Sequence, residues 1–194
     1  SNRETYSFTD IILFIEKILR QQDADAVFVD PYNSLKVQSG KVSEHQYHYE
    51  AASEFLTFSN KNDVAVWLNM HAVTEAQRRK GDDGLPIAPF AEDTEGGGKF
   101  VNRADSFITI HRKVQAPDTE QKRTVEFHVR KTREVETGGQ PTPWEDPVKF
   151  SFNTQATGFR ITTTFKELFQ PIQMQKSEQR EFKLEPNENF LSTT

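Results

Sequence analysis

The sequence contains no cysteine, and this absence removes several kinds of protein from consideration. A chain without cysteine has no disulfide framework, no thiolate zinc site and no cysteine nucleophile, which suits a reducing compartment. Long apolar runs are also missing, since none approaches the ~20 residues that cross a bilayer. The segment from Ser1 to Tyr6 is polar and does not resemble a secretory leader. We therefore expect a cytoplasmic protein without membrane association.

An excess of positive charge is missing as well, because 24 lysines and arginines face 29 acidic residues, for a net charge of -5. Binding to nucleic acid would have to rely on a local basic patch. With 194 residues, of which 35% are hydrophobic, the chain can form one domain with a sizeable core. We expect that domain over residues 1–169. Residues 170–194 are rich in Gln, Glu, Lys and Asn and are expected to form a weakly ordered tail.

The first 70 residues alternate between helical and strand-like patterns. The predicted elements are a helix from an N-cap at Thr9 up to Gln21, a strand over Ala26–Val29, a helix from an N-cap at Ser43 to about Phe58 and a strand over Val64–Met70. Both strands are almost wholly apolar, which is typical of buried parallel strands. The order helix, strand, helix, strand predicts an α/β fold.

The periodicity disappears between Ala72 and Gly98, where glycine and proline predict a long surface loop. Strand-like patterns then return in four places: Phe107–His111, Thr124–Val129, Val148–Phe152 and Phe159–Thr163. The last two flank a turn that contains Gly158 and predict a hairpin. The fold class expected is therefore α/β, with a mostly parallel sheet flanked by helices and a C-terminal antiparallel hairpin.

Two polar residues follow directly after apolar strands. In parallel α/β sheets, ligands bind at the carboxyl ends of the strands, where Asp30 and His71 would lie. There, Asp30 could hold the water shell of a magnesium ion on nucleotide phosphates, and His71 could hydrogen-bond a terminal phosphate. The alternatives are an aspartate that forms the turn at Pro31 and a histidine with an ordinary hydrogen-bonding role.

Two groups of basic residues complete the candidate site. Lys131 and Arg133 would project from one side of a strand end, because side chains in a strand alternate. Such cations can stabilise charge on a transferred phosphoryl group. The three adjacent cations from Arg78 through Arg79 to Lys80 could follow a phosphate backbone. A solvated strand end and a solvated loop are the respective alternatives, and the loop also carries acidic residues.

Other functional motifs are incomplete or absent in the sequence. Gly98-Lys99 is not a Walker A loop, because the spacing requires glycine at Asp93 and serine or threonine at Phe100. Glu44, His45 and His48 could be imagined as metal ligands at the start of a helix, but no H-E-x-x-H pattern or further ligand accompanies them. A solvated helix face is the preferred interpretation. No G-x-S-x-G element is present, so a serine hydrolase is not supported.

The order of these features resembles the later motifs of DnaB-type and phage ring replicative helicases, which have a RecA-like ATPase core. The resemblance covers about residues 25–164 and rests on the strand ending in Asp30, the strand before His71 and three segments: the glycine-rich run at 96–98, the segment 102–112, and 131–133 with Gly138-Gly139. It implies that Asp30 ends the Walker B strand and that His71 senses the γ-phosphate. Lys131 and Arg133 would reach the ATP site of the adjacent subunit.

The resemblance further implies ATP and Mg²⁺ as cofactors, with Asp30, Asn33 and His71 near the nucleotide. Single-stranded DNA would be bound by Arg78, Arg79, Lys80 and Lys99. The partner subunits would be copies of the same chain in a ring.

The sequence departs from the family because it contains neither a Walker A loop nor the catalytic glutamate that lies upstream. We therefore expect the C-terminal part of an ATPase with an incomplete core, not competent for hydrolysis alone and with exposed sheet edges. Two alternatives remain open. One is a RecA-type recombination ATPase, and the other is a catalytically silent module that binds a replication partner.

Overall fold

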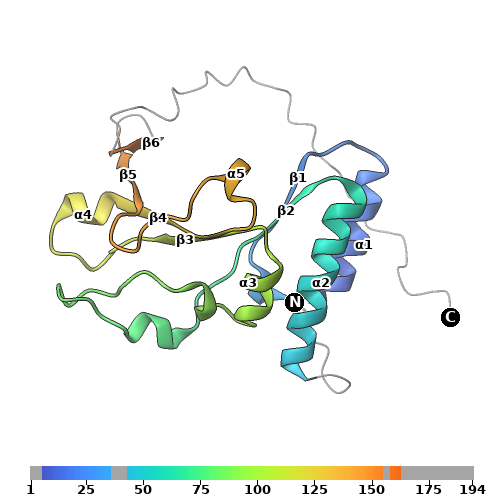
Figure 1. The fold of residues 1–194 in the computed structure, drawn as a ribbon, viewed down its shortest axis with the longest axis horizontal. Helices are drawn as coiled ribbons and strands as arrows, with labels where there is room; N and C mark the ends of the chain where they lie inside the picture. Colours follow the sequence, from blue (N-terminus) through green and yellow to red (C-terminus); the bar gives the residue numbers. More distant parts are fainter. Residues whose placement is uncertain (1–5, 36–42, 155–157, 163–194) are drawn as a thin grey trace, which may run out of the picture.

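The computed structural model describes residues 6–35, 43–154 and 158–162 (Figure 1). Its helices and strands are, in chain order, α1 (Phe8–Leu19), β1 (Ala26–Val29), the 3₁₀ helix η1 (Tyr32–Ser34), α2 (Glu44–Asn62), β2 (Ala65–Leu68), the 3₁₀ helices η2 (Thr74–Arg78) and η3 (Ala91–Asp93), α3 (Gly98–Arg103), β3 (Ser106–His111), α4 (Thr119–Arg123), β4 (Thr124–Thr132), α5 (Val135–Gly138), β5 (Val148–Asn153) and β6 (Gly158–Ile161). The predicted tail over residues 170–194 lies outside the described residues.

Helix α1 begins two residues earlier than its apolar pattern predicted. Its N-cap is Ser7 and not Thr9, because the Ser7 hydroxyl accepts a hydrogen bond from the Asp10 amide while the Asp10 carboxylate accepts one from the Ser7 amide at 2.8 Å. This reciprocal capping box satisfies two amides that the first turn of a helix would otherwise leave unpaired. The predicted helix is confirmed, and its N-cap is corrected.

Helix α2 is capped by Ser43, as predicted, and the Ser43 hydroxyl accepts a hydrogen bond from the Gln46 amide. The helix continues to Asn62, four residues beyond the predicted end at Phe58, and stops where Asp63 adopts a left-handed conformation with φ of 53°. A left-handed residue at this position terminates the helical hydrogen-bonding pattern.

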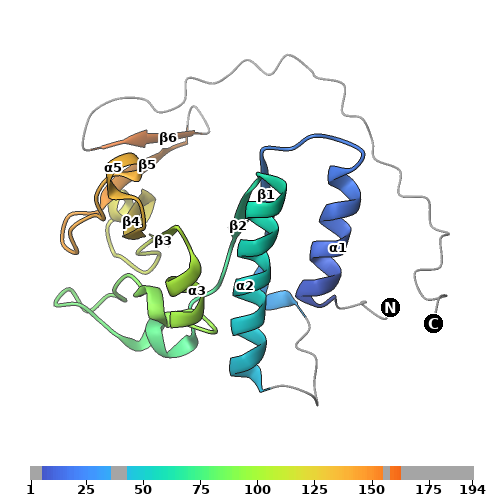
Figure 2. The same cartoon turned by 45° about the vertical axis from the view of Figure 1, so that its right-hand side comes forward.

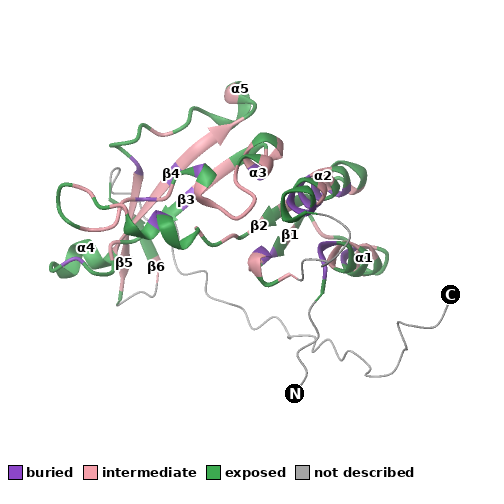
Figure 3. Cartoon of the chain, turned by 90° about the horizontal axis from the view of Figure 1, so that it is seen from below, coloured by how far each residue is buried: buried purple, intermediate pink, exposed green. Residues whose placement is uncertain are grey.

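Strands β1 and β2 form a parallel pair in which Val29 lies opposite Leu68. Helices α1 and α2 pack on the same side of this pair (Figures 2 and 3). The buried core there contains Phe8, Val29, Tyr32, Tyr47, Ala51, Ala52, Phe55 and Phe100. Burying an aromatic or aliphatic side chain of this kind contributes about 1.5–3 kcal/mol to folding.

The opposite face of the β1–β2 pair is bare among the described residues, because no described helix covers it, and this corrects the expectation that both strands are buried. Phe28 is 71% exposed and Trp67 is 49% exposed, and their rings stack with centroids 5.7 Å apart. The strands therefore alternate between a covered and an uncovered face, as in a sheet with helices on one side only. An apolar sequence alone does not distinguish this arrangement from a strand covered on both faces.

The remaining strands form an antiparallel sheet in the order β3-β4-β5-β6. The predicted β5–β6 hairpin is confirmed, with Asn153 opposite Gly158, although its predicted last residue, Thr163, lies outside the described residues. Strand β4 continues to Thr132, three residues past the predicted end. The α/β class is confirmed, with the parallel pairing confined to β1 and β2 among the described strands.

A groove of about 480 Å³ lies between the two sheets. Residues of β2 line one wall of the groove, and residues of β3 line the other. Within the described part of the chain, β2 pairs only with β1, and β3 pairs only with β4. Both strands therefore present an unpaired edge to the groove, consistent with the expected exposed sheet edges.

Candidate nucleotide site

The carboxyl ends of β1 and β2 bring two polar residues together. Because Val29 lies opposite Leu68, the residues that follow them, Asp30 and Asn69, leave the sheet side by side. The Asn69 amide group donates a hydrogen bond of 2.6 Å to one carboxylate oxygen of Asp30. Both side chains are exposed, so the second Asp30 oxygen can bind a ligand from solvent.

Hydrogen bonds connect the turn after β1 to the segment after β2. The Tyr32 amide donates to the Asn69 carbonyl oxygen at 2.8 Å, and the Asn33 side-chain oxygen accepts a hydrogen bond of 2.7 Å from the His71 amide. These bonds bring Asp30, Asn33 and His71 together at one edge of the parallel pair, the edge at which Asp30 and His71 were expected. The His71 side chain is exposed there, in a position suited to hydrogen bonding with an anion.

Asn69 belongs to this edge and was missed in the sequence. The available signal was its polarity, because it follows the apolar residues of β2 and precedes His71 by two positions. Its side chain fixes the orientation of the Asp30 carboxylate, which is the kind of support that a metal-binding carboxylate commonly has.

Lys131 and Arg133 both lie beside the last turn of α3. The Lys131 ammonium donates to the carbonyl oxygens of Val101 and Asn102, at 2.5 and 3.3 Å. The Arg133 guanidinium donates to the Arg103 carbonyl at 2.7 Å and pairs with Asp105 at 2.6 Å. Burial, and then the charge of Arg133, lower the pKa of Lys131. The two cations are thus held together by carbonyl oxygens of their own chain.

The basic residues in the loop differ in their surroundings. Arg78 is exposed and pairs with Glu75 at 2.9 Å. Arg79 pairs with Asp93, and its guanidinium lies 4.6 Å from the centre of the Phe90 ring, so it fastens the loop to η3. Lys80 is exposed, and Lys99 is half-buried in α3. Arg78 and Lys80 are therefore the most accessible cations in this group.

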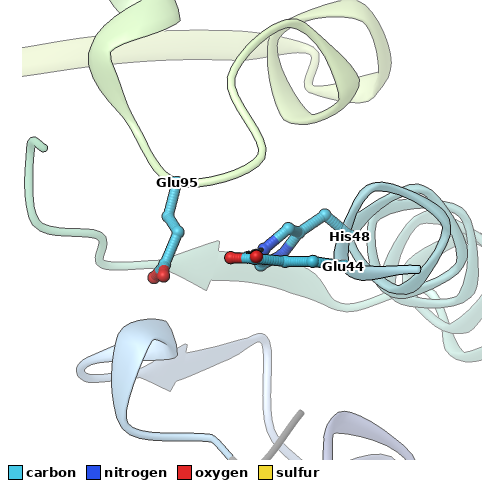
Figure 4. Close-up of side chains that lie close together, drawn as sticks. All are labelled: Glu44, His48 and Glu95. Carbon is cyan, nitrogen blue, oxygen red and sulfur yellow. Dashed lines mark ion pairs between the residues drawn. The ribbon is translucent and has the colours of Figure 1, made fainter. Parts of the chain in front are cut away.

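A further polar cluster joins α2 to the segment before α3 (Figure 4). It contains Glu44, His48 and Glu95, whose potential ligand atoms all lie within 4.8 Å of one another. From the sequence, Glu44 and His48 were expected to form part of a solvated helix face. This interpretation is wrong for His48, which is only 3% exposed. Glu95 was missed, because 47 residues separate it from His48 in the chain.

Known structures share the architecture described above. The ATPase domain of G40P superposes with a TM-score of 0.62 at 18% identity, over 80% of this chain and 51% of that one. A DnaB-like replicative helicase, described with its interactions with primase, has a TM-score of 0.62 at 16% identity, over 79% of this chain and 34% of that one. The chain has the fold of a DnaB-type helicase ATPase domain.

The DnaB-type fold confirms the RecA-like architecture that the resemblance predicted. The chain spans about half the length of the first of these structures and about a third of the second. No protein-family model matches the sequence, and comparison with curated protein sequences also gives no match. Among the described helices, none is long and apolar enough to cross a membrane.

Proposed function

We propose that this chain is the C-terminal part of an ATP-dependent DNA helicase-type ATPase whose phosphate-binding loop lies outside these 194 residues. The observation that carries the proposal is the paired edge formed by Asp30 and Asn69 at the carboxyl ends of two parallel strands. In open α/β sheets this edge is the usual place for a phosphate ligand. The DnaB-type fold supports the same function.

Each residue at this edge would have its own role in binding the nucleotide, set by the chemistry of its side chain. Asp30 would hold Mg²⁺, through its water shell, next to the phosphates of ATP. His71 would hydrogen-bond the terminal phosphate and so distinguish the nucleotide before and after hydrolysis. Asn33 would keep the backbone of His71 in place through the bond that it accepts from the His71 amide.

Lys131 and Arg133 would act on the nucleotide of a neighbouring copy in a ring of identical subunits. In the single chain, both cations donate hydrogen bonds to backbone carbonyl oxygens, and Arg133 also forms an ion pair with Asp105. Phosphate oxygens bind such cations more strongly than neutral carbonyl oxygens do, so a neighbouring nucleotide could replace these contacts. An arginine supplied in this way typically raises the rate of phosphoryl transfer by about a thousandfold or more.

The experiment that tests this arrangement mixes two inactive variants of a protein that contains this chain together with a phosphate-binding loop. Asp30→Asn removes the magnesium ligand, and Arg133→Ala removes the cation. Each variant alone should show almost no DNA-stimulated hydrolysis. In an equal mixture, about a quarter of the interfaces combine an intact Asp30 with an intact Arg133 of the neighbour, so about a quarter of the wild-type rate should return. If the mixture stays inactive, or if Arg133→Ala alone hydrolyses normally, the role in the neighbouring site is wrong.

Single-stranded DNA is the proposed second ligand of the ring. Its phosphates would be contacted by Arg78, Lys80 and Lys99, with Arg79 holding the loop in place through Asp93. Unwinding of a forked duplex by the longer protein would favour a helicase over a recombination ATPase.

The bare aromatic face favours one alternative, a silent module that binds a replication partner. The stacked and exposed rings of Phe28 and Trp67 are suited to contact with another protein. ATP hydrolysis by the longer protein would exclude this alternative. Failure to bind nucleotide, together with loss of partner binding in Trp67→Ser, would support it.

A further inference from the structure

The buried histidine of α2 has one unpaired ring nitrogen. His48 is 3% exposed, and its Nδ1 atom lies 2.8 Å from the Tyr32 hydroxyl. The Nε2 atom is buried and has no hydrogen-bond partner among the described residues. An unpaired buried polar atom lowers the free energy of unfolding by about 1–3 kcal/mol. Such atoms are therefore uncommon in native proteins, and a bound ion is one explanation for them.

Two carboxylates face this nitrogen. Glu44, one helical turn before His48, places an oxygen 3.7 Å from Nε2, too far for a hydrogen bond. Glu95 comes from the segment before α3, on the other side, and Figure 4 shows its carboxylate next to the side chains of Glu44 and His48. Within the described part of the chain, neither glutamate forms an ion pair with a lysine or an arginine. The cluster therefore contains two uncompensated negative charges.

The backbone brings Glu95 close through a position that only glycine fits. Gly96 has φ of +77°, and a Cβ atom there would lie 2.7 Å from the Cβ atom of His48 and 2.9 Å from the Phe100 ring. The turn that carries Glu95 is thus packed directly on His48, and this contact holds the carboxylate at the cluster.

Outer contacts also orient the side chains of the cluster. Asn33 donates a hydrogen bond of 2.6 Å to Glu95. Tyr32 is buried 2.8 Å from Nδ1 of His48, so in the tautomer with its proton on Nδ1 the ring donates a hydrogen bond to the Tyr32 hydroxyl. That tautomer leaves the lone pair of Nε2 directed at the carboxylates. A ligand histidine whose other nitrogen is hydrogen-bonded is the usual arrangement in metal sites.

We propose that Glu44, His48 and Glu95 bind a divalent transition-metal ion, with zinc as the ion that fits best. One imidazole nitrogen and two carboxylate oxygens match the ligands that zinc takes, with water as the fourth. In a tetrahedral zinc site the ligand atoms lie about 3.4 Å apart, given bonds of about 2.0–2.2 Å. The observed distance of 3.7 Å and the limit of 4.8 Å mean that pairs of ligand atoms must approach each other by at most about 1.4 Å, which is about 0.7 Å per atom if both atoms move.

Such an ion would fasten the segment before α3 to α2. Asn33 contacts both Glu95 and the His71 amide, so the ion would also stabilise the turn at the carboxyl ends of β1 and β2. This role is structural and does not depend on ATP hydrolysis.

The test is a calorimetric titration of this chain with Zn²⁺ after removal of all metal. We expect one equivalent to bind. Glu44→Gln and Glu95→Gln should each weaken the affinity by about tenfold or more, since even indirect supports of a metal site cost tenfold to a hundredfold. His45→Ala is the matched control, because His45 is the exposed neighbour on the same helix, and it should bind as the wild type does. Circular dichroism should show that all three variants are folded.

A second titration, with Co²⁺, follows the absorption bands of the ion in its site. We expect intense tetrahedral bands in the wild type and in His45→Ala but not in Glu95→Gln. The proposal is wrong if no saturable binding of zinc occurs. It is equally wrong if the two glutamate variants bind normally, or if His45→Ala weakens binding as much as they do, because the ion would then be held by surface histidines.

Discussion

Replacing Gly96 by alanine should destabilise the protein far more than the same change at Gly84. Both glycines have a left-handed backbone, with φ of +77° and +71°. An alanine in that region costs about 1–2 kcal/mol. At Gly96 the added Cβ atom would also lie 2.7 to 2.9 Å from atoms of His48 and Phe100, whereas at Gly84 no atom lies within 4 Å.

The overlap at Gly96 adds about 1–3 kcal/mol, the usual cost of forcing an extra carbon into a packed site. The free energy of unfolding should therefore fall by about 2–5 kcal/mol in Gly96→Ala and by about 1–2 kcal/mol in Gly84→Ala. Urea denaturation followed by circular dichroism measures both values, with the slope of the transition as a check that the unfolded states are comparable. Equal losses in the two variants would refute the close packing of the Glu95 turn on His48.

Three further outcomes are expected. Ser7→Ala should lower the free energy of unfolding by about 1 kcal/mol, and Thr9→Ala should change it by less than about 0.5 kcal/mol, because Ser7 caps α1; urea denaturation that ranks the two in reverse would contradict the assignment. Burial lowers the pKa of His111 in the folded chain, so the unfolded chain takes up the proton first and thermal stability should fall as pH drops below 6.5; a melting temperature that declines equally between pH 7 and 5 in His111→Gln would contradict this. Arg78→Ala should weaken the binding of single-stranded DNA and reduce the slope of log affinity against log salt by about 0.7 in fluorescence anisotropy, whereas the exposed Arg123→Ala in α4 should leave both unchanged.

Elements specified by local patterns were predicted with the correct type and nearly the correct bounds. Strand β1 was predicted residue for residue, because the charged residues Asp25 and Asp30 bracket its apolar run. The Ser43 cap of α2 was also predicted. The cap of α1 was not, because the start of the apolar pattern was given more weight than the Ser7 and Asp10 pair, whose spacing is that of a capping box.

The environment of the strands could not be predicted, because it depends on which elements cover the sheet. Phe28 and Trp67 are as apolar as Val29 and Leu68, yet the helices cover only the second pair. Neighbouring residues in a strand point to opposite faces of the sheet. An apolar sequence does not determine whether other elements cover one or both of these faces.

The part of the candidate site that lies at the strand ends could be predicted from the sequence. Asp30 and His71 were placed at one edge because the carboxyl ends of parallel strands meet there. Glu95 could not be placed beside His48, because that contact depends on the turn at Gly96 and on packing against Phe100. Similarly, the contacts of Lys131 and Arg133 with α3 follow from the pairing of β3 with β4.

The central claim is that Asp30 holds the magnesium ion of an ATP site, and it is tested most directly by the rate of DNA-stimulated ATP hydrolysis in Asp30→Asn. The protein measured is the longer one that includes a phosphate-binding loop, and Asp25→Asn, at the opposite end of the same strand, is the matched control. Loss of a metal ligand that contributes several kcal/mol to the transition state predicts a rate at least about a hundredfold lower in Asp30→Asn, with Asp25→Asn unchanged. A normal rate in Asp30→Asn would contradict the account.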